Sequence, residues 1–199
     1  MTAKRNLFVS RSPICDRLSK RSGIAYSIAT AGGRLMDQSI AYHEAGHAVV
    51  AAWLGAEVVS VTLQPDDDDG PRRDGDAAIR WHHRGLSPRE LCQRELMAVL
   101  AGPVAEMIHS GESWGIHQFP QWAADWELSR QLAAMLVPTV AHIDPLIEFT
   151  IQKLERLAAQ EAFWQTIAEV ADLLEAFETI DGEQVKECLD RWLGGASGG

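Results

Sequence analysis

The sequence predicts a mainly α-helical fold that also contains one small β-hairpin and ends in a helical bundle. Two observations lead to this fold class: apolar residues recur with helical periodicity over most of the chain after residue 39, and only two short segments alternate as strands do. The chain has 199 residues, of which 46% are hydrophobic, so it is long and apolar enough to bury a sizeable core. No internal repeat is present.

The first expected helix runs from Ser39 to Leu54, and Gly55 supplies its C-terminal stop. Two strands are expected next, at 57–63 and 77–83, because valine and other strand-forming residues alternate there with small or polar ones. We expect these strands to pair as a hairpin across a long charged loop.

That loop contains the acidic run Asp66–Asp69. It does not match a calcium-binding loop, because Pro65 would stand at the first ligand position if Gly70 occupied the turn position. A solvated loop is therefore expected.

The second helix has a well-marked start, with Ser87 as N-cap, Pro88 in the first turn and Glu90 completing a capping box. It should continue to a stop at Gly111, with a kink at Pro103.

Further amphipathic helices are expected at 122–136 and, two or three in number, between residues 143 and 193. The last of these should begin at Asp181 and end at Gly194–Gly195.

The expected domain organisation is a basic tail without fixed structure at 1–36, one folded domain at 37–193 and a flexible Gly-rich tail at 194–199. Residues 1–34 hold seven Lys or Arg and one acidic residue. This composition also fits an organellar transit peptide, or sequence upstream of a true start at Met36, and the sequence leaves these alternatives open.

Charge and cysteine content narrow the function classes. The net charge is −10, and the acidic body argues against nucleic-acid binding because it offers no basic face to phosphates. No apolar run reaches the length of a membrane span, so no transmembrane segment is expected. The three separated cysteines indicate a reducing compartment, here the cytoplasm, and exclude a zinc site built from cysteines.

The stretch "AYHEAGHAVVAAWLG" (41–55) contains the spacing His-Glu-x-x-His. Residues four apart lie on one face of a helix, so the imidazoles of His43 and His47 can bind a single Zn²⁺ ion. Glu44 would then lie beside the metal, where its carboxylate can take the proton of a water that the metal activates. Gly46 weakens the helix and suggests that another element packs closely there.

Because a catalytic zinc usually has three protein ligands, a third must come from later in the chain. Glu106 and Asp125 are the strongest candidates, since both occur in helices that are otherwise rich in Ala, Leu and Trp. The weaker candidates, each more typical of a surface histidine, are His82, His83, His109, His117 and His142. Spacing alone does not choose between these residues.

The segments "AYHEAGHAVVAAWLG", "LMAVLAGPVAEMI", "AADWELSRQLA" and "ETIDGEQV" resemble, in order and spacing, the peptidase domain of the FtsH family of ATP-dependent zinc metalloproteases. The resemblance covers about residues 37–190. It implies a helical, zincin-like metalloprotease domain in which His43, His47 and Asp125 hold Zn²⁺ and Glu44 is the catalytic base. Glu106 would orient a ligand imidazole from the side facing away from the metal, and it is the alternative third ligand.

The sequence departs from the family in lacking a P-loop, so no ATPase module is recognisable. The expected function is a zinc-dependent metalloendopeptidase that cleaves unfolded or flexible proteins, without ATP on its own or with a separate ATPase as partner. Self-association into a homo-oligomer is compatible with this function. The alternatives are a non-cleaving zinc-containing regulatory or binding module, and a helical scaffold in which the motif arose by chance.

Trp114, Trp122 and Trp126 surround the Asp125 segment, and we expect them to pack in the core or form the wall of a cleft.

Overall fold

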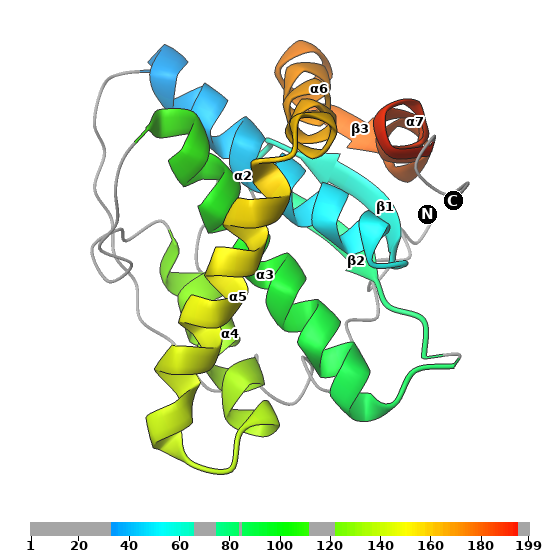
Figure 1. The fold of residues 1–199 in the computed structure, drawn as a ribbon. Helices are drawn as coiled ribbons and strands as arrows, with labels where there is room; N and C mark the ends of the chain where they lie inside the picture. The colour runs from blue at the N-terminus through cyan, green and yellow to red at the C-terminus, as the bar shows by residue number, and fades with distance from the viewer. Residues whose placement is uncertain (1–32, 66–74, 84, 112–121, 195–199) are drawn as a thin grey trace, which may run out of the picture.

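The computed structural model describes residues 33–65, 75–83, 85–111 and 122–194, and the side chains from residue 38 onward. Helices make up most of this part (Figure 1), which confirms the predicted mainly α fold. The elements in chain order are α2 (Gly33–Trp53), β1 (Glu57–Thr62), β2 (Asp76–Arg80), α3 (Pro88–Ser110), α4 (Ala123–Leu136), the 3₁₀ helix η2 (Val140–His142), α5 (Ile143–Ala158), α6 (Glu161–Phe177), β3 (Thr179–Asp181) and α7 (Gly182–Leu193).

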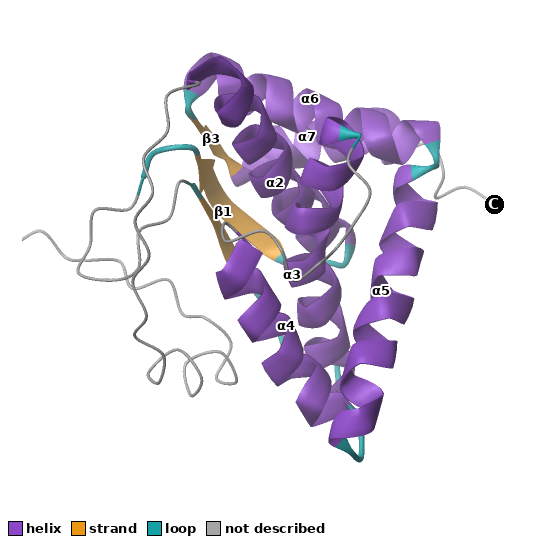
Figure 2. Ribbon diagram, turned by 90° about the vertical axis from the view of Figure 1, so that its left-hand side faces the viewer, coloured by secondary structure: helices purple, strands orange, loops and turns teal. Residues whose placement is uncertain are grey.

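The strands lie together on one side of the molecule (Figure 2) and form an antiparallel sheet in the order β2-β1-β3. The predicted hairpin of β1 and β2 is present, but the prediction of a hairpin alone was wrong. The third strand, β3, pairs with the other edge of β1, placing Ile180 opposite Val61. The sequence did not predict β3, because three residues are too few to show the alternation of a strand. Asp181 instead has the features of an N-cap for the following helix.

The first helix is longer than expected, because α2 begins at Gly33 and not at about Ser39. The second follows the prediction closely: the Ser87 hydroxyl accepts from the backbone N–H of Glu90, and the Glu90 side chain completes the capping box. This helix continues through Pro103, and Gly111 ends it in the left-handed conformation with φ of 69°.

The C-terminal part consists of α5, α6 and α7, as the periodicity predicted. Asp181 caps α7 through a capping box with Gln184. Helix α6 packs against α2 and α7, whereas α5 packs mainly on α3, so the bundle is built around the first two helices.

The most extensive contact between elements is that of α2 with α3. Gly46 of α2 faces α3 so closely that a Cβ atom there would lie 2.5 Å from the Ala101 carbonyl oxygen and 2.8 Å from the Ala105 Cβ. Ala45, Ala48 and other small or branched apolar residues of α2 are fully buried around it. The expectation that another element packs closely on Gly46 is therefore confirmed.

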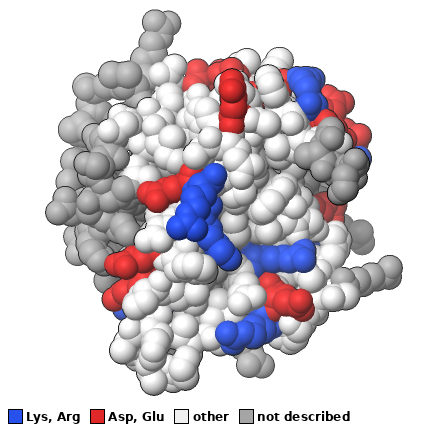
Figure 3. Space-filling model, viewed as in Figure 1, with Lys and Arg blue, Asp and Glu red and all other residues white. Residues whose placement is uncertain are grey.

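Among the described residues, no single helix is long and apolar enough to cross a membrane. Helix α4 and the segment Val140–Ala158 pass that test of length and composition only when taken together, and they meet at a bend of 118°. On the face that Figure 3 shows, acidic and basic side chains are interspersed. The expectations for the tail up to residue 32, for the acidic run Asp66–Asp69 and for Trp114 lie outside the described residues.

Replacing Gly46 with alanine should destabilise the protein. The added methyl group meets backbone atoms of α3, and such overpacking costs about 1–3 kcal/mol. Alanine gains only about 1 kcal/mol in helix propensity over glycine. Urea denaturation with a chelator present would measure the free energy of unfolding. The control is the pair of variants Gln152→Gly and Gln152→Ala at an exposed position of α5. The difference between their free energies of unfolding gives the helix-propensity contribution without any packing effect. A Gly46→Ala protein more stable than the wild type would contradict the close packing.

Candidate metal centre

Helix α2 carries the motif residues His43, Glu44 and His47 within little more than one turn. The two imidazole rings stand nearly perpendicular, with an interplanar angle of 80° and centroids 4.6 Å apart. Their Nε2 atoms are 3.0 Å from each other. The helix thus directs one nitrogen of each ring to a common point, as the i, i+4 spacing predicted.

Asp125, in the first turn of α4, brings a carboxylate to the same point. Its Oδ2 lies 3.1 Å from Nε2 of His43, and its Oδ1 lies 3.6 Å from Nε2 of His47. Within the part of the chain that the structure describes, these three residues form the one group of at least three His, Cys, Asp or Glu side chains that could hold a metal ion. The tertiary fold thus assembles the ligand set that the resemblance implied.

The separations between these atoms suit a small tetrahedral cation. With bonds of 2.0–2.1 Å to nitrogen and oxygen, neighbouring ligand atoms around zinc stand about 3.3 Å apart. The three observed separations of 3.0, 3.1 and 3.6 Å lie on both sides of this value.

The outer nitrogens of the rings show which atoms carry the protons. His43 Nδ1 lies 3.0 Å from Oε2 of Glu106, and His47 Nδ1 lies 2.9 Å from the carbonyl oxygen of Ala98. A carboxylate and a carbonyl only accept hydrogen bonds, so each Nδ1 is a donor. When the rings are neutral, both Nε2 atoms and the Asp125 carboxylate therefore direct lone pairs at one point, and only a cation or a proton there can stabilise them. The residues fit a metal ion.

Glu106 of α3 contacts His43 from the side opposite the convergent atoms, where an orienting residue was predicted. Its Oε2 also accepts a hydrogen bond from the indole Nε1 of Trp122, at 2.5 Å. The geometry therefore gives Glu106 a supporting position and leaves Asp125 as the third convergent group.

The backbone of α3 supports His47, which the sequence analysis missed. Besides the Ala98 carbonyl, the ring faces Gly102, where a Cβ atom would lie 2.3 Å from Nε2 of His47. The sequence feature that could have indicated this contact is the pair of small residues Ala101–Gly102. A glycine inside a helix lowers its stability, so its presence suggests that another group packs closely against it.

Glu44 is buried, with 7% of its surface exposed, and lies beside the hairpin. A Cβ atom at Gly75, just before β2, would be 2.9 Å from Oε1 of Glu44. The next residue, Asp76, is close enough for its charge to act on His47. The start of β2 therefore borders the metal centre, a placement that the sequence did not indicate.

The carboxylates change the proton affinity of the two rings in opposite directions. Burial by itself lowers the pKa of His43, but hydrogen bonds to Asp125 and Glu106, with the charges of Asp125 and Glu44, raise it to about 10. For His47, burial outweighs the attraction of Asp125 and lowers the pKa below its usual value. Without a metal, the proton at the centre therefore resides on His43 at neutral pH.

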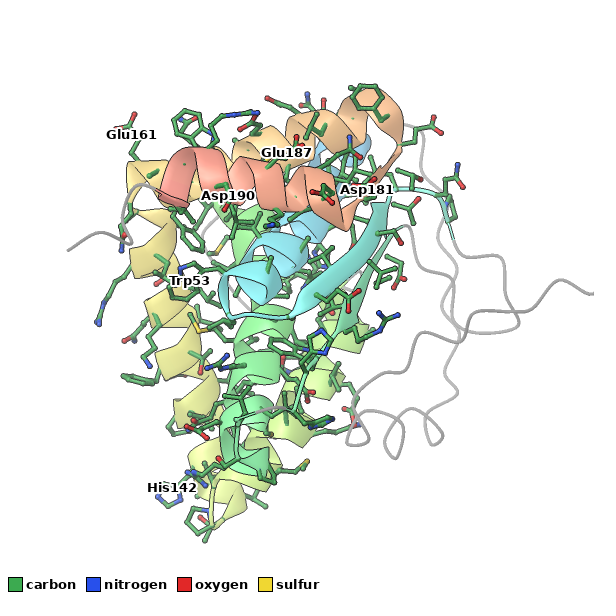
Figure 4. The ribbon with its side chains drawn as sticks, turned by 90° about the vertical axis from the view of Figure 1, so that its right-hand side faces the viewer. Trp53, His142, Glu161, Asp181, Glu187 and Asp190 are labelled. Atoms are coloured by element: carbon green, nitrogen blue, oxygen red, sulfur yellow. The ribbon has the colours of Figure 1, made fainter. Side chains whose placement is uncertain are left out.

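The other candidate histidines in the described residues do not join the site. His82 pairs with Glu57, His109 stacks on Tyr42, and His142 contacts the Thr139 hydroxyl. Figure 4 shows His142 at the far tip of the molecule, where α4 and α5 meet. His83 is exposed at the end of the hairpin. His117 lies outside the described residues.

Substituting alanine at Gly102 should prevent metal binding. The methyl group would overlap the coordinating edge of the His47 ring, with contacts of 2.3–2.7 Å, so the ring must turn away from Asp125. Zinc retained after exhaustive dialysis, measured by atomic absorption beside far-UV circular dichroism, checks this. Stoichiometric zinc in a folded Gly102→Ala protein would show that the ring position is wrong.

Metal binding at neutral pH should release about one proton, because the cation replaces the proton that His43 holds up to a pH of about 10. Calorimetric titration in two buffers of different ionisation enthalpy gives the number of protons released. His43 is half deprotonated at a pH of about 10, so the release should fall to about half a proton there and disappear only at higher pH. A proton count of zero at pH 7 would contradict the assigned protonation of His43.

Comparison with models of known protein families gives no match, and a search of curated proteins finds no similar sequence. A function for this centre therefore has to be inferred from its geometry and from the motif resemblance.

Proposed function

We propose that this protein is a zinc-dependent metalloendopeptidase, with His43, His47 and Asp125 as the metal ligands and Glu44 as the general base. One observation carries the proposal: two imidazoles of α2 and a carboxylate of α4 direct three lone-pair atoms to one point, with a buried carboxylate next to them in the chain. Zinc is the cation we propose because two histidines four residues apart on one helix, with a glutamate after the first, are the arrangement typical of zinc peptidases.

The chemistry proposed is hydrolysis of a peptide bond. Zinc at the centre would supply a Lewis acid that polarises the substrate carbonyl and lowers the pKa of a water molecule. The Glu44 carboxylate removes a proton from that water as the water oxygen bonds to the carbonyl carbon. Glu44 then returns the proton to the amide nitrogen as the carbon–nitrogen bond breaks. Its burial beside Gly75 keeps the carboxylate at one place relative to His43.

The surroundings of the centre support a polypeptide substrate. Strand β2 lies at an edge of the described sheet, and its start borders Glu44. An extended chain can pair with such an edge through main-chain hydrogen bonds, which hold a scissile bond without demanding a particular side chain. Together with the motif resemblance, this supports the helical, zincin-like FtsH type of peptidase as the family to test.

The deciding experiment combines zinc content with cleavage of an unfolded protein such as casein, so that no unfolding activity is required. Glu44→Gln should keep one zinc per chain and lose activity by at least about a hundredfold, because the amide cannot accept the water proton. Asp125→Ala should lose both zinc and activity, because two imidazoles alone hold the ion weakly.

Glu127→Gln, two residues after Asp125 and exposed, is the matched control and should retain zinc and activity. A wild-type protein that binds zinc but cleaves no unfolded substrate would instead support the non-cleaving module. Absence of stoichiometric zinc in the wild type would remove the metal centre, and with it the enzyme.

A further inference from the structure

Trp122, at the N-cap position of α4, forms a hydrogen bond that the chemistry of peptide hydrolysis does not require. Its side chain is buried, with 5% of its surface exposed. The indole Nε1 donates to Oε2 of Glu106 at 2.5 Å. The same oxygen accepts from Nδ1 of His43 at 3.0 Å, so one carboxylate oxygen joins the indole to a metal ligand.

We propose that Trp122 is a positioning residue of the metal centre, which fixes the Glu106 carboxylate and, through it, the ring of His43. The inference rests on the proposed function only as far as metal binding, and it does not require that the protein cleaves peptides.

The physical reason is that a carboxylate can rotate about its last side-chain bond. If His43 were its only partner, the Glu106 group could turn and carry the imidazole with it, since that torsion is soft. A second donor on the same oxygen, in a buried site, restricts that rotation. An indole N–H is suited to this role because it can only donate a hydrogen bond. It therefore cannot accept the Nδ1 proton that His43 donates to Glu106.

The same bond also fixes the beginning of the helix that carries the third ligand. Helix α4 has no side-chain cap at its start, and Trp122 stands within one turn of Asp125. The bond from Trp122 therefore ties the first turn of α4 to α3, and it makes the relative position of His43 and Asp125 depend on Glu106.

The competing explanation is that Trp122 only fills space in the core, where its ring is one of the buried hydrophobic groups. The two roles can be tested separately. Filling space requires only the shape of the ring, whereas positioning Glu106 requires the indole N–H. Trp122→Phe removes the donor and some volume. Site-specific replacement of Trp122 by benzothienylalanine, whose sulfur takes the place of the N–H, removes the donor and keeps the shape.

The experiment measures zinc affinity of the full chain by competition with a chromogenic chelator. Either replacement at Trp122 should weaken zinc binding about tenfold. This is the lower end of the loss in metal affinity expected when a group that supports a metal ligand is removed. In a Glu106→Ala background the same replacements should change the affinity less than twofold, because the acceptor is already absent. Co²⁺ in place of zinc should show altered visible absorption in the Trp122 variants, reporting a change in ligand geometry.

Trp192→Phe is the matched control. Trp192 of α7 makes a similar bond, from its indole Nε1 to Oε2 of Glu169 at 2.6 Å, away from the metal centre. Its loss should leave zinc affinity and the Co²⁺ spectrum unchanged.

The results distinguish this inference from the proposed function. Unchanged zinc affinity and Co²⁺ spectrum in the benzothienylalanine protein would overturn it, as would an equal loss in the Glu106→Ala background, which would show a purely structural role. A wild-type protein that binds no zinc would overturn the metal centre and this inference together. Zinc binding without peptidase activity would overturn the proposed enzyme alone and leave the role of Trp122 standing.

Discussion

The close approach of α2 and α3 is the constraint on which the candidate metal centre depends. Gly46 of α2 and Gly102 of α3 have no Cβ atom at this contact, so the helices approach closely and the ring of His47 can lie over α3 and reach the Ala98 carbonyl. A methyl group at either glycine would occupy space that the opposing helix or the ring now fills. Helix packing thus fixes the direction of the His47 lone pair before any ligand is considered.

Charge balance is the second condition that the site must meet. Glu44 and Glu106 are buried, and Asp125 is partly buried beside the two imidazoles. Burying several carboxylates in an apolar core costs free energy unless positive charge or hydrogen bonds offset it. Glu106 is stabilised by two donors, whereas the charge of Asp125 is met by the proton that His43 holds at neutral pH. A divalent cation between the same three residues would meet this need with twice the charge.

The supporting groups come from several elements that are distant in the sequence. His43 is positioned by Glu106 of α3, Glu106 by Trp122 at the start of α4, and Glu44 lies against Gly75 at the start of β2. Two of these contacts connect α2 to α3 and to the start of β2, and the third connects α3 to the start of α4. The centre is therefore rigid only when the whole arrangement of helices and sheet is in place, as preorganised sites require.

The sequence by itself determined the helices, the β1–β2 hairpin and the motif, because each depends on local spacing: helical periodicity, capping boxes at Ser87 and Asp181, and two histidines four residues apart. The composition of their helices nominated both Asp125 and Glu106, and only the resemblance of their segments to the FtsH family chose between them. Only the tertiary structure decided which of them faces the Nε2 atoms, because that depends on how α3 and α4 pack against α2. The third strand, the Ala98 carbonyl and the bond from Trp122 to Glu106 also depend on long-range contacts, and these leave no periodic pattern in the chain.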